Sequence, residues 1–68
     1  MKKYEYKVTT ARCYEADAPK VVIEVLRREK RGGWRLVSTR NTRYQVEGLA
    51  PTEEILFTFK RLVSEESE

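Results

Sequence analysis

The sequence contains no histidine and only one cysteine, Cys13. Without histidine the chain lacks the commonest general base of enzymes, and a single thiol cannot form an internal disulfide. Histidine and cysteine also supply most of the ligands of zinc sites in proteins. We therefore expect no metal site and no catalysis that depends on an imidazole.

Long apolar runs are also missing. No segment approaches the roughly 20 apolar residues that a membrane-spanning helix needs. The opening segment MKKYEYKV begins with a lysine pair but lacks the apolar stretch of a secretory signal peptide. We expect a cytoplasmic protein with no membrane contact.

The chain has 68 residues, which is enough for one small domain. Hydrophobic residues make up 40% of it, which is too many for a disordered chain. Lysine and arginine number 14 against 11 aspartates and glutamates, for a net charge of +3. We expect a single domain over residues 1–63 and an acidic flexible tail over residues 64–68.

Three segments alternate with the period of a β-strand. Residues 2–10 place Tyr4, Tyr6 and Val8 on one side and charged or polar residues on the other. The second strand is predicted over residues 34–40, with a continuation to Val46 as the alternative, and the third over residues 54–63. Residues 11–16 and 47–52 are predicted loops.

Residues 17–31 are predicted to form an amphipathic helix. Asp17 and Pro19 are typical of a helix start, and the pair Gly32 and Gly33 is typical of a helix end. The segment VVIEV also suits a strand, because β-branched residues favour sheets. We favour the helix, since its start and end signals agree with the charged continuation LRREKR.

The predicted fold is α+β, a three-stranded, mainly antiparallel sheet in β-α-β-β order with one helix packed on one face. We expect the helix residues Val21, Val22, Val25 and Leu26 to meet Tyr4, Tyr6, Val8, Trp34, Leu36, Ile55, Phe57 and Phe59. The opposite face would carry Val37, Leu56 and Leu62 among charges. One helix cannot cover both faces, so either solvent or another subunit covers the second one, and we favour a homo-oligomer.

Three short motifs resemble one family. The segments KYEYKV, GWRLVS and LFTFKR follow one another in the order found in domain of unknown function 4177, a family of small bacterial and phage proteins. The resemblance spans nearly the whole chain and implies the same architecture, but no activity. The chain departs from the family pattern just before Gly33, at Glu29 and Lys30. The order of elements, with a tryptophan at the start of the second strand, is also similar to the dodecins, which implies flavin or a nucleotide as a ligand to be considered.

The candidate ligand site lies around Trp34. Its flat ring follows two glycines and suits stacking on a flavin or a nucleotide base, or else it anchors the helix end on the sheet. The cations and the hydroxyl that follow it suit an anionic ligand. We assign to this ligand site Trp34, Arg35, Arg40, Arg43 and Tyr44.

A second hypothesis concerns nucleic acid. Between positions 27 and 43 seven cations accompany one anion, Glu29, and such a strip suits phosphates. It also suits a solvated helix face. The residues assigned to this alternative are Arg27, Arg28, Lys30 and Arg31.

Two further residues have ordinary interpretations. Glu29 falls near the centre of the apolar helix face, and we expect the last helical turn to lift off the sheet so that Glu29 reaches water. The alternative is a buried carboxylate paired across an interface. Cys13 has no histidine to activate it, and we expect a small residue of a loop or an edge.

The sequence therefore predicts a homo-oligomeric binding module that is not an enzyme. It would capture a small anionic or nucleotide-like ligand, or a protein partner, at a subunit interface. The alternative is a nucleic-acid-associated accessory protein that uses the basic strip.

Overall fold

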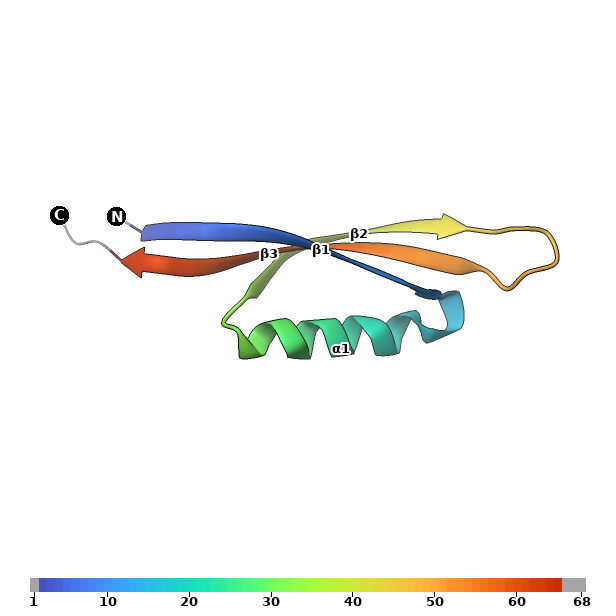
Figure 1. The fold of residues 1–68 in the computed structure, drawn as a ribbon, viewed down its shortest axis with the longest axis horizontal. Coiled ribbons are helices and arrows are strands. Elements are labelled where there is room, and N and C mark those ends of the chain that lie inside the picture. Colours follow the sequence, from blue (N-terminus) through green and yellow to red (C-terminus); the bar gives the residue numbers. More distant parts are fainter. Residues whose placement is uncertain (1, 66–68) are drawn as a thin grey trace.

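A computed structural model describes residues 2–65, and within them the side chains of residues 2–63. The strand β1 (Lys2–Tyr14) is followed by a single 3-10 turn (Glu15–Asp17), the helix α1 (Ala18–Arg31), and the strands β2 (Arg35–Tyr44) and β3 (Thr52–Glu65). Both strand pairings are antiparallel, and the order across the sheet is β1-β3-β2. The predicted α+β fold and element order are confirmed, with the helix on one side of the sheet (Figure 1).

The helix begins and ends where the local signals place it. Pro19 lies in the first turn, although Asp17 makes no side-chain capping hydrogen bond. At the other end Gly33 has φ +84°, a left-handed conformation that glycine adopts without steric cost. The amides of Gly33 and Trp34 donate to the carbonyls of Lys30 and Glu29. These two bonds form a Schellman motif, which turns the chain back toward the sheet.

Strands β1 and β3 are longer than the sequence predicts, whereas β2 ends at Tyr44, between the two ends considered for it. Residues 11–14, predicted as loop, continue β1 and pair with β3 as far as Tyr14 opposite Thr52. Strand β3 extends to Glu65, and the rest of the predicted tail lies outside the described residues. The prediction of a loop over residues 11–14 was wrong. These residues show no clear alternation of apolar and polar side chains, so their own preference for a strand is weak, and pairing with β3 holds them in the sheet.

The core lies between α1 and the central strand. Val25, Ile55, Phe57 and Phe59 are buried, and the rings of Phe57 and Phe59 stack with centroids 6.0 Å apart. Around this centre lie partly buried residues from β1, α1 and the start of β2, namely Ala11, Cys13, Ala18, Val21, Val22, Leu26 and Trp34.

The predicted contribution of β1 to the core was wrong. Tyr4, Tyr6 and Val8 are 40%, 63% and 59% exposed, and they lie on the face away from α1. The register explains this, because Phe57 and Ile55 face the helix and their partners in β1 are Thr9 and Ala11. Small residues fit beneath a closely packed helix where tyrosines would not.

Leu36 was also predicted in the core and is 42% exposed. It lies opposite Phe59, but in an outer strand whose ten residues are all exposed. A register shift follows it at Val37, between Leu36 and Ser38. The helix therefore covers β1 and β3 and leaves β2 open.

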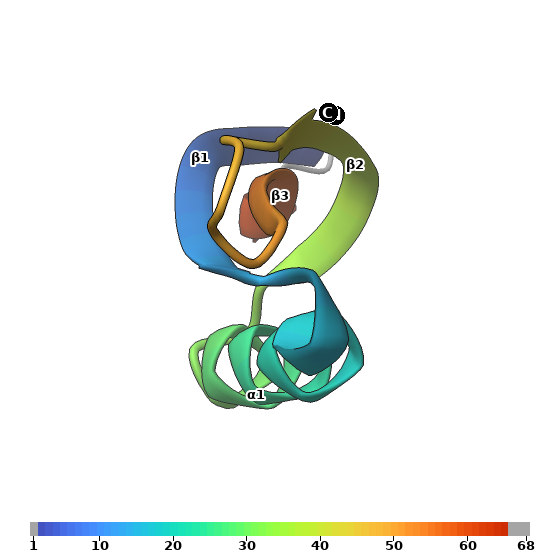
Figure 2. The ribbon, with the colours of Figure 1, turned by 90° about the vertical axis from the view of Figure 1, so that its right-hand side faces the viewer.

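The molecule is elongated. Its extents are 60 × 18 × 10 Å and its radius of gyration is 15.4 Å, against about 11 Å for a compact chain of this length. Figure 1 shows the sheet running past the helix at both ends, and Figure 2 shows β1 and β2 winding around β3. One helix thus covers only the middle of one face of a long, twisted sheet.

Candidate functional site

Trp34 lies under two cations. It directly follows the glycine turn that ends α1, packs against the core, and remains partly exposed. The Lys7 ammonium lies 4.7 Å and the Arg61 guanidinium carbon 4.4 Å from the centroid of one of its rings. Cations in this position are attracted to the electron-rich face of the indole. A ligand that stacks on Trp34 would have to displace one of these contacts.

Carboxylates balance both cations. Lys7 forms an ion pair with Glu29, and Arg61 binds Glu5 through two nitrogens. Arg61 also donates to the carbonyl of Gly32 at 3.1 Å, which ties the end of α1 to β3. Near Trp34 the two positive and two negative charges therefore cancel.

The prediction that Glu29 reaches water was wrong. Glu29 is only 7% exposed, because the last turn of α1 stays on the sheet and points this side chain at Lys7 of β1. Arg28 adds a weaker partner, its Nε lying 3.7 Å from Glu29 Oε1. The other oxygen, Oε2, is buried and is the one that pairs with the Lys7 ammonium, which compensates its charge.

The five predicted ligand residues do not meet within one chain. Trp34 lies directly before β2 and Arg35 is its first residue, whereas Arg43 and Tyr44 lie at its end. At about 3.3 Å per residue the two ends are roughly 30 Å apart. Arg40 lies between them, opposite Leu56 on the face away from α1.

At its far end β2 makes its own contacts. Arg43 donates to Glu15 at 2.9 Å, and the Arg12 guanidinium carbon lies 5.7 Å from the centroid of the Tyr44 ring. Arg35 and Arg40 have no ion pair with any carboxylate in the part of the chain that the structure describes.

The seven cations between positions 27 and 43 do not form one surface. Arg27, Arg28, Lys30 and Arg31 are all exposed on the last turns of α1. The three arginines of β2 lie on the sheet instead, Arg35 and Arg40 on the face away from α1 and Arg43 on the opposite face. Only the helical part of the strip is one continuous patch.

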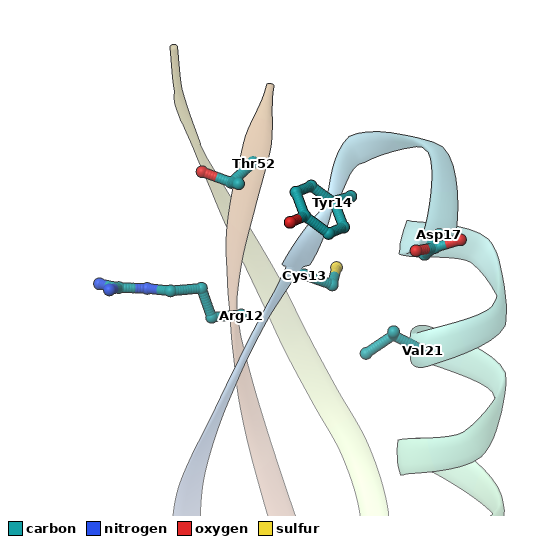
Figure 3. A pocket seen from close by; sticks show the side chains of 6 residues that line it. All are labelled: Arg12, Cys13, Tyr14, Asp17, Val21 and Thr52. Carbon is teal, nitrogen blue, oxygen red and sulfur yellow. The ribbon is translucent and has the colours of Figure 1, made fainter. Parts of the chain in front are cut away.

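Hollows occur at the start of α1, whereas Trp34 lies just beyond its end. Figure 3 shows one of about 380 Å³, lined by Arg12, Cys13, Tyr14, Asp17, Val21 and Thr52. A neighbouring one of about 490 Å³ is lined by Tyr14, Ala16, Asp17, Leu49, Ala50 and Thr52. Both are shallow surface depressions, and sequence reasoning found neither because they form where β1, the 3-10 turn and residues 49–52 come together.

Cys13 faces the helix at the floor of the first hollow (Figure 3). Its partial burial raises the pKa of the thiol above the ordinary value, and the carboxylates of Glu53 and Asp17 raise it further. A raised pKa leaves less thiolate at neutral pH, and the thiolate is the nucleophile. The environment of Cys13 therefore does not activate it.

Sequence reasoning missed Lys7, Arg61 and Glu5 as neighbours of Trp34. Lys7 and Phe59 are paired across β1 and β3, and Glu5 and Arg61 form the next pair on the same face. The available signal was the opposite charge of residues 5 and 61, but it can be used only once the register is known.

Among the described residues no helix is long and apolar enough to cross a membrane, and no three or more aspartate, glutamate, cysteine or histidine side chains gather as a metal site would require. No protein-family model, curated protein or solved structure matches this chain.

Proposed function

We propose that the chain is a homo-oligomeric binding module, not an enzyme, and that it captures a small anionic, nucleotide-like ligand between subunits along β2. The observation that carries the proposal is the open edge of β2. Its ten residues are all exposed, and it forms one border of the sheet. An unpaired edge offers a row of backbone donors and acceptors to another strand.

Antiparallel pairing of two β2 strands would unite the predicted ligand residues. The start of one strand, with Trp34 and Arg35, would lie beside the end of the other, with Arg43 and Tyr44. Residues that are roughly 30 Å apart in one chain would then form two equivalent sites, each built from both subunits.

Charge supports an anionic ligand. A pair of β2 strands would bring two copies of Arg35, Arg40 and Arg43 to one border, and these like charges repel each other. A bound anion offsets this repulsion, and a ligand that binds only the paired form stabilises it. We therefore propose that ligand binding and pairing support each other.

Mixing two variants tests the composite site. Trp34→Phe and Arg43→Gln would each damage one half of the site, and binding of ADP or FMN would be followed by ligand fluorescence or calorimetry. In an equal mixture, heterodimers carry one intact site and one doubly damaged site, so about a quarter of all sites should recover. No recovery on mixing, or unchanged binding by Trp34→Phe in a folded protein, would contradict the shared site.

Light-scattering mass on a size-exclusion column tests the assembly itself. We expect a multiple of the 8.1 kDa chain mass, with excess absorbance near 260 or 450 nm if a nucleotide or flavin remains bound through purification. A monomer at all concentrations, with or without added nucleotide, would contradict the proposal.

The resemblance to domain of unknown function 4177 and the weaker similarity to the dodecins stay predictions. The nucleic-acid alternative assigned to the helical basic patch also stays a prediction. If that alternative holds, replacing Arg27 and Arg31 by glutamine would abolish the binding of nucleic acid and would leave ligand binding along β2 intact.

A further inference from the structure

All four tyrosines of the chain lie on the sheet face away from α1. Tyr4, Tyr6 and Tyr14 alternate along β1 with residues that face the helix. Tyr14 and Tyr44 flank the same residue of β3, Thr52, from its two sides. We call this surface the tyrosine face, and it was not foreseen from the sequence because Tyr4 and Tyr6 were predicted in the core.

The rings of the tyrosine face are accessible. The four side chains are between 40% and 63% exposed, although large aromatic side chains usually bury most of their area in a core or an interface. Val8 and Leu62 on the same face are also exposed. Within the described residues the only helix lies on the other side of the sheet (Figure 1).

Cations accompany the tyrosines. Arg12, Arg35, Arg40 and Lys60 occupy positions on this face, and among the described strand side chains its one carboxylate is Glu54. Arg12 neutralises Glu54 through an ion pair at 3.1 Å. Three positive charges remain, two of which, on Arg35 and Arg40, have no ion-pair partner among the described residues.

Rings and cations are also side by side. Tyr6, Lys60 and Arg35 form one row across the three strands, in which Lys60 lies between the tyrosine and the arginine. The Lys60 ammonium lies 4.9 Å from the centroid of the Tyr4 ring. The end of the face with Tyr4 and Tyr6 thus combines flat apolar surface with net positive charge, whereas at the other end the Arg12 guanidinium over Tyr44 is paired with Glu54.

This combination fits a chain of bases joined by phosphates. Unpaired bases stack on aromatic side chains, and arginine and lysine neutralise the phosphates between them. Tyr4 and Tyr6 are two strand residues apart, about 6.7 Å, whereas Tyr6 and Tyr14 are separated by about 27 Å. The two groups of tyrosines would therefore contact different parts of one extended strand.

The twist of the sheet favours a flexible ligand. Because β1 and β2 wind around β3, the face turns along the molecule (Figure 2). A single strand can follow this turn, but a stiff duplex keeps its bases stacked inside and cannot present them to the tyrosines.

A second copy of the chain fits this face less well. Two tyrosine faces packed together would bring the excess positive charges of each against those of the other, and like charges buried in an interface are costly. A polyanion meets the same charges with the opposite sign.

We propose that the tyrosine face binds single-stranded nucleic acid without sequence preference, through stacking on the tyrosines and contacts of Arg35, Arg40 and Lys60 with phosphates. The inference goes beyond the ligand site along β2. It shares Arg35, Arg40 and Tyr44 with that site, but its decisive residues, Tyr6 and Tyr14, belong to β1 and take no part there.

The first experiment is fluorescence anisotropy with a labelled 20-nucleotide oligothymidylate. We expect it to bind about tenfold or more tightly than an abasic strand of the same length, and more tightly than a duplex, because stacking contributes per base. The logarithm of the affinity should fall with the logarithm of the salt concentration with a slope of about −2, as expected for three phosphate contacts to a single strand. Equal binding of the abasic strand, or no binding of any strand, would overturn the proposal.

Variants separate stacking from other contributions. Tyr6→Ser and Tyr14→Ser should each weaken binding about tenfold, whereas Tyr6→Phe and Tyr14→Phe keep the rings and should bind nearly as well. Both positions are more than half exposed, so the fold should survive, and circular dichroism checks this. Ile23→Ser, which changes an exposed residue of α1, is the matched control and should have no effect.

Two outcomes would overturn the proposal by placing the nucleic acid on the helix or by showing a second copy on the tyrosine face. Loss of binding in the double variant Arg27→Gln and Arg31→Gln, with Tyr6→Ser unaffected, would place the nucleic acid on the helix instead. A dimer that Tyr6→Ser dissociates, in a protein that binds none of the strands, would show that a second copy covers the face. Trp34→Phe should leave oligothymidylate binding unchanged, so failure of the β2 site and failure of this inference are distinguishable.

Discussion

At the scale of single residues, the least expected arrangement is a buried carboxylate within a small core. Glu29 occupies a position on α1 that its neighbours Val22 and Val25 mark as apolar, and it is held there by Lys7. Removing one partner of such a pair leaves a charge in a place that water reaches poorly. The Lys7–Glu29 ion pair therefore fixes the position of α1 on β1, and it contributes little net stability.

We expect Lys7→Met to lower the free energy of unfolding by about 2 kcal/mol, less than for a fully buried pair because the Lys7 side chain is 36% exposed. The double variant Lys7→Met and Glu29→Leu should recover most of this loss, since it leaves no unpaired charge. Urea unfolding measures both. Arg12→Gln, which breaks an exposed ion pair with Glu54, is the control and should change stability by about 0.5 kcal/mol or less. A Lys7→Met protein as stable as the parent would show that Glu29 is solvated.

The thiol of Cys13 gives a prediction for pH. Burial and the carboxylates of Glu53 and Asp17 raise its pKa, so the thiolate forms at higher pH in the folded chain than in the unfolded one. The rate of alkylation by iodoacetamide should therefore rise with pH at a higher midpoint in buffer than in concentrated urea. Because the folded state holds this proton more tightly, the thiol should also reduce stability as the pH rises above its unfolded pKa.

Removing the carboxylates tests the stated cause. Glu53→Gln and Asp17→Asn should each lower the midpoint for alkylation of Cys13, and Glu24→Gln, an exposed change on α1, should not. A folded-state midpoint equal to or below that of the unfolded chain would disprove the raised pKa.

At the scale of elements, the turn after α1 links helix, strand and tryptophan. Gly33 supplies the left-handed residue, the amide of Trp34 closes the helix, and Arg61 holds the carbonyl of Gly32. A Cβ on Gly33 would meet Arg61 Cδ at 3.5 Å, which is an ordinary contact. A side chain at position 33 would therefore lower stability through the positive φ of the backbone and not through a steric clash.

We expect Gly33→Ala to lower the free energy of unfolding by about 1 kcal/mol, because alanine pays for a positive φ that glycine adopts freely. Gly33→Asn should cost less, since asparagine tolerates the left-handed region. Urea unfolding of the two variants measures the difference. Equal stability of Gly33→Ala and the parent would mean that the turn changes conformation to accommodate the methyl group.

At the scale of the whole molecule, the core is small for the surface it supports. Four apolar residues are buried among those described, while the molecule is 60 Å long and its sheet is open along β2 and the tyrosine face. Small domains with so little buried area usually gain stability from another source, such as association. This agrees with the proposed pairing along β2.

Association predicts that the melting temperature depends on protein concentration. Because pairing stabilises the folded chain by mass action, we expect the melting temperature to rise by several degrees over about a hundredfold increase in concentration. Adding ADP or FMN at fixed protein concentration should raise it further if ligand binding and pairing are coupled. Differential scanning fluorimetry on Trp34 follows both changes, and a melting temperature independent of concentration would contradict a paired form.

The sequence by itself determined the elements, because their signals are local. The 3.6-residue period, Pro19 and the glycine pair define α1 through interactions within a few residues, and alternation identifies three strands. The tertiary structure decided which face of each strand is buried. Read alone, β1 presents its tyrosine side as the core face, but pairing Phe57 with Thr9 selected the side that carries Lys7, Ala11 and Cys13.

The same limit applies to the candidate sites. The residues grouped around Trp34 by their order in the chain are spread along β2, whereas Lys7 and Arg61, distant in sequence, are the ones that contact the ring. The tyrosine face exists only because the register turns Tyr4, Tyr6 and Tyr14 away from α1 and places Tyr44 beside them. A shift of one residue in register moves every side chain of a strand to the opposite face, so these surfaces depend on long-range pairing that no local pattern encodes.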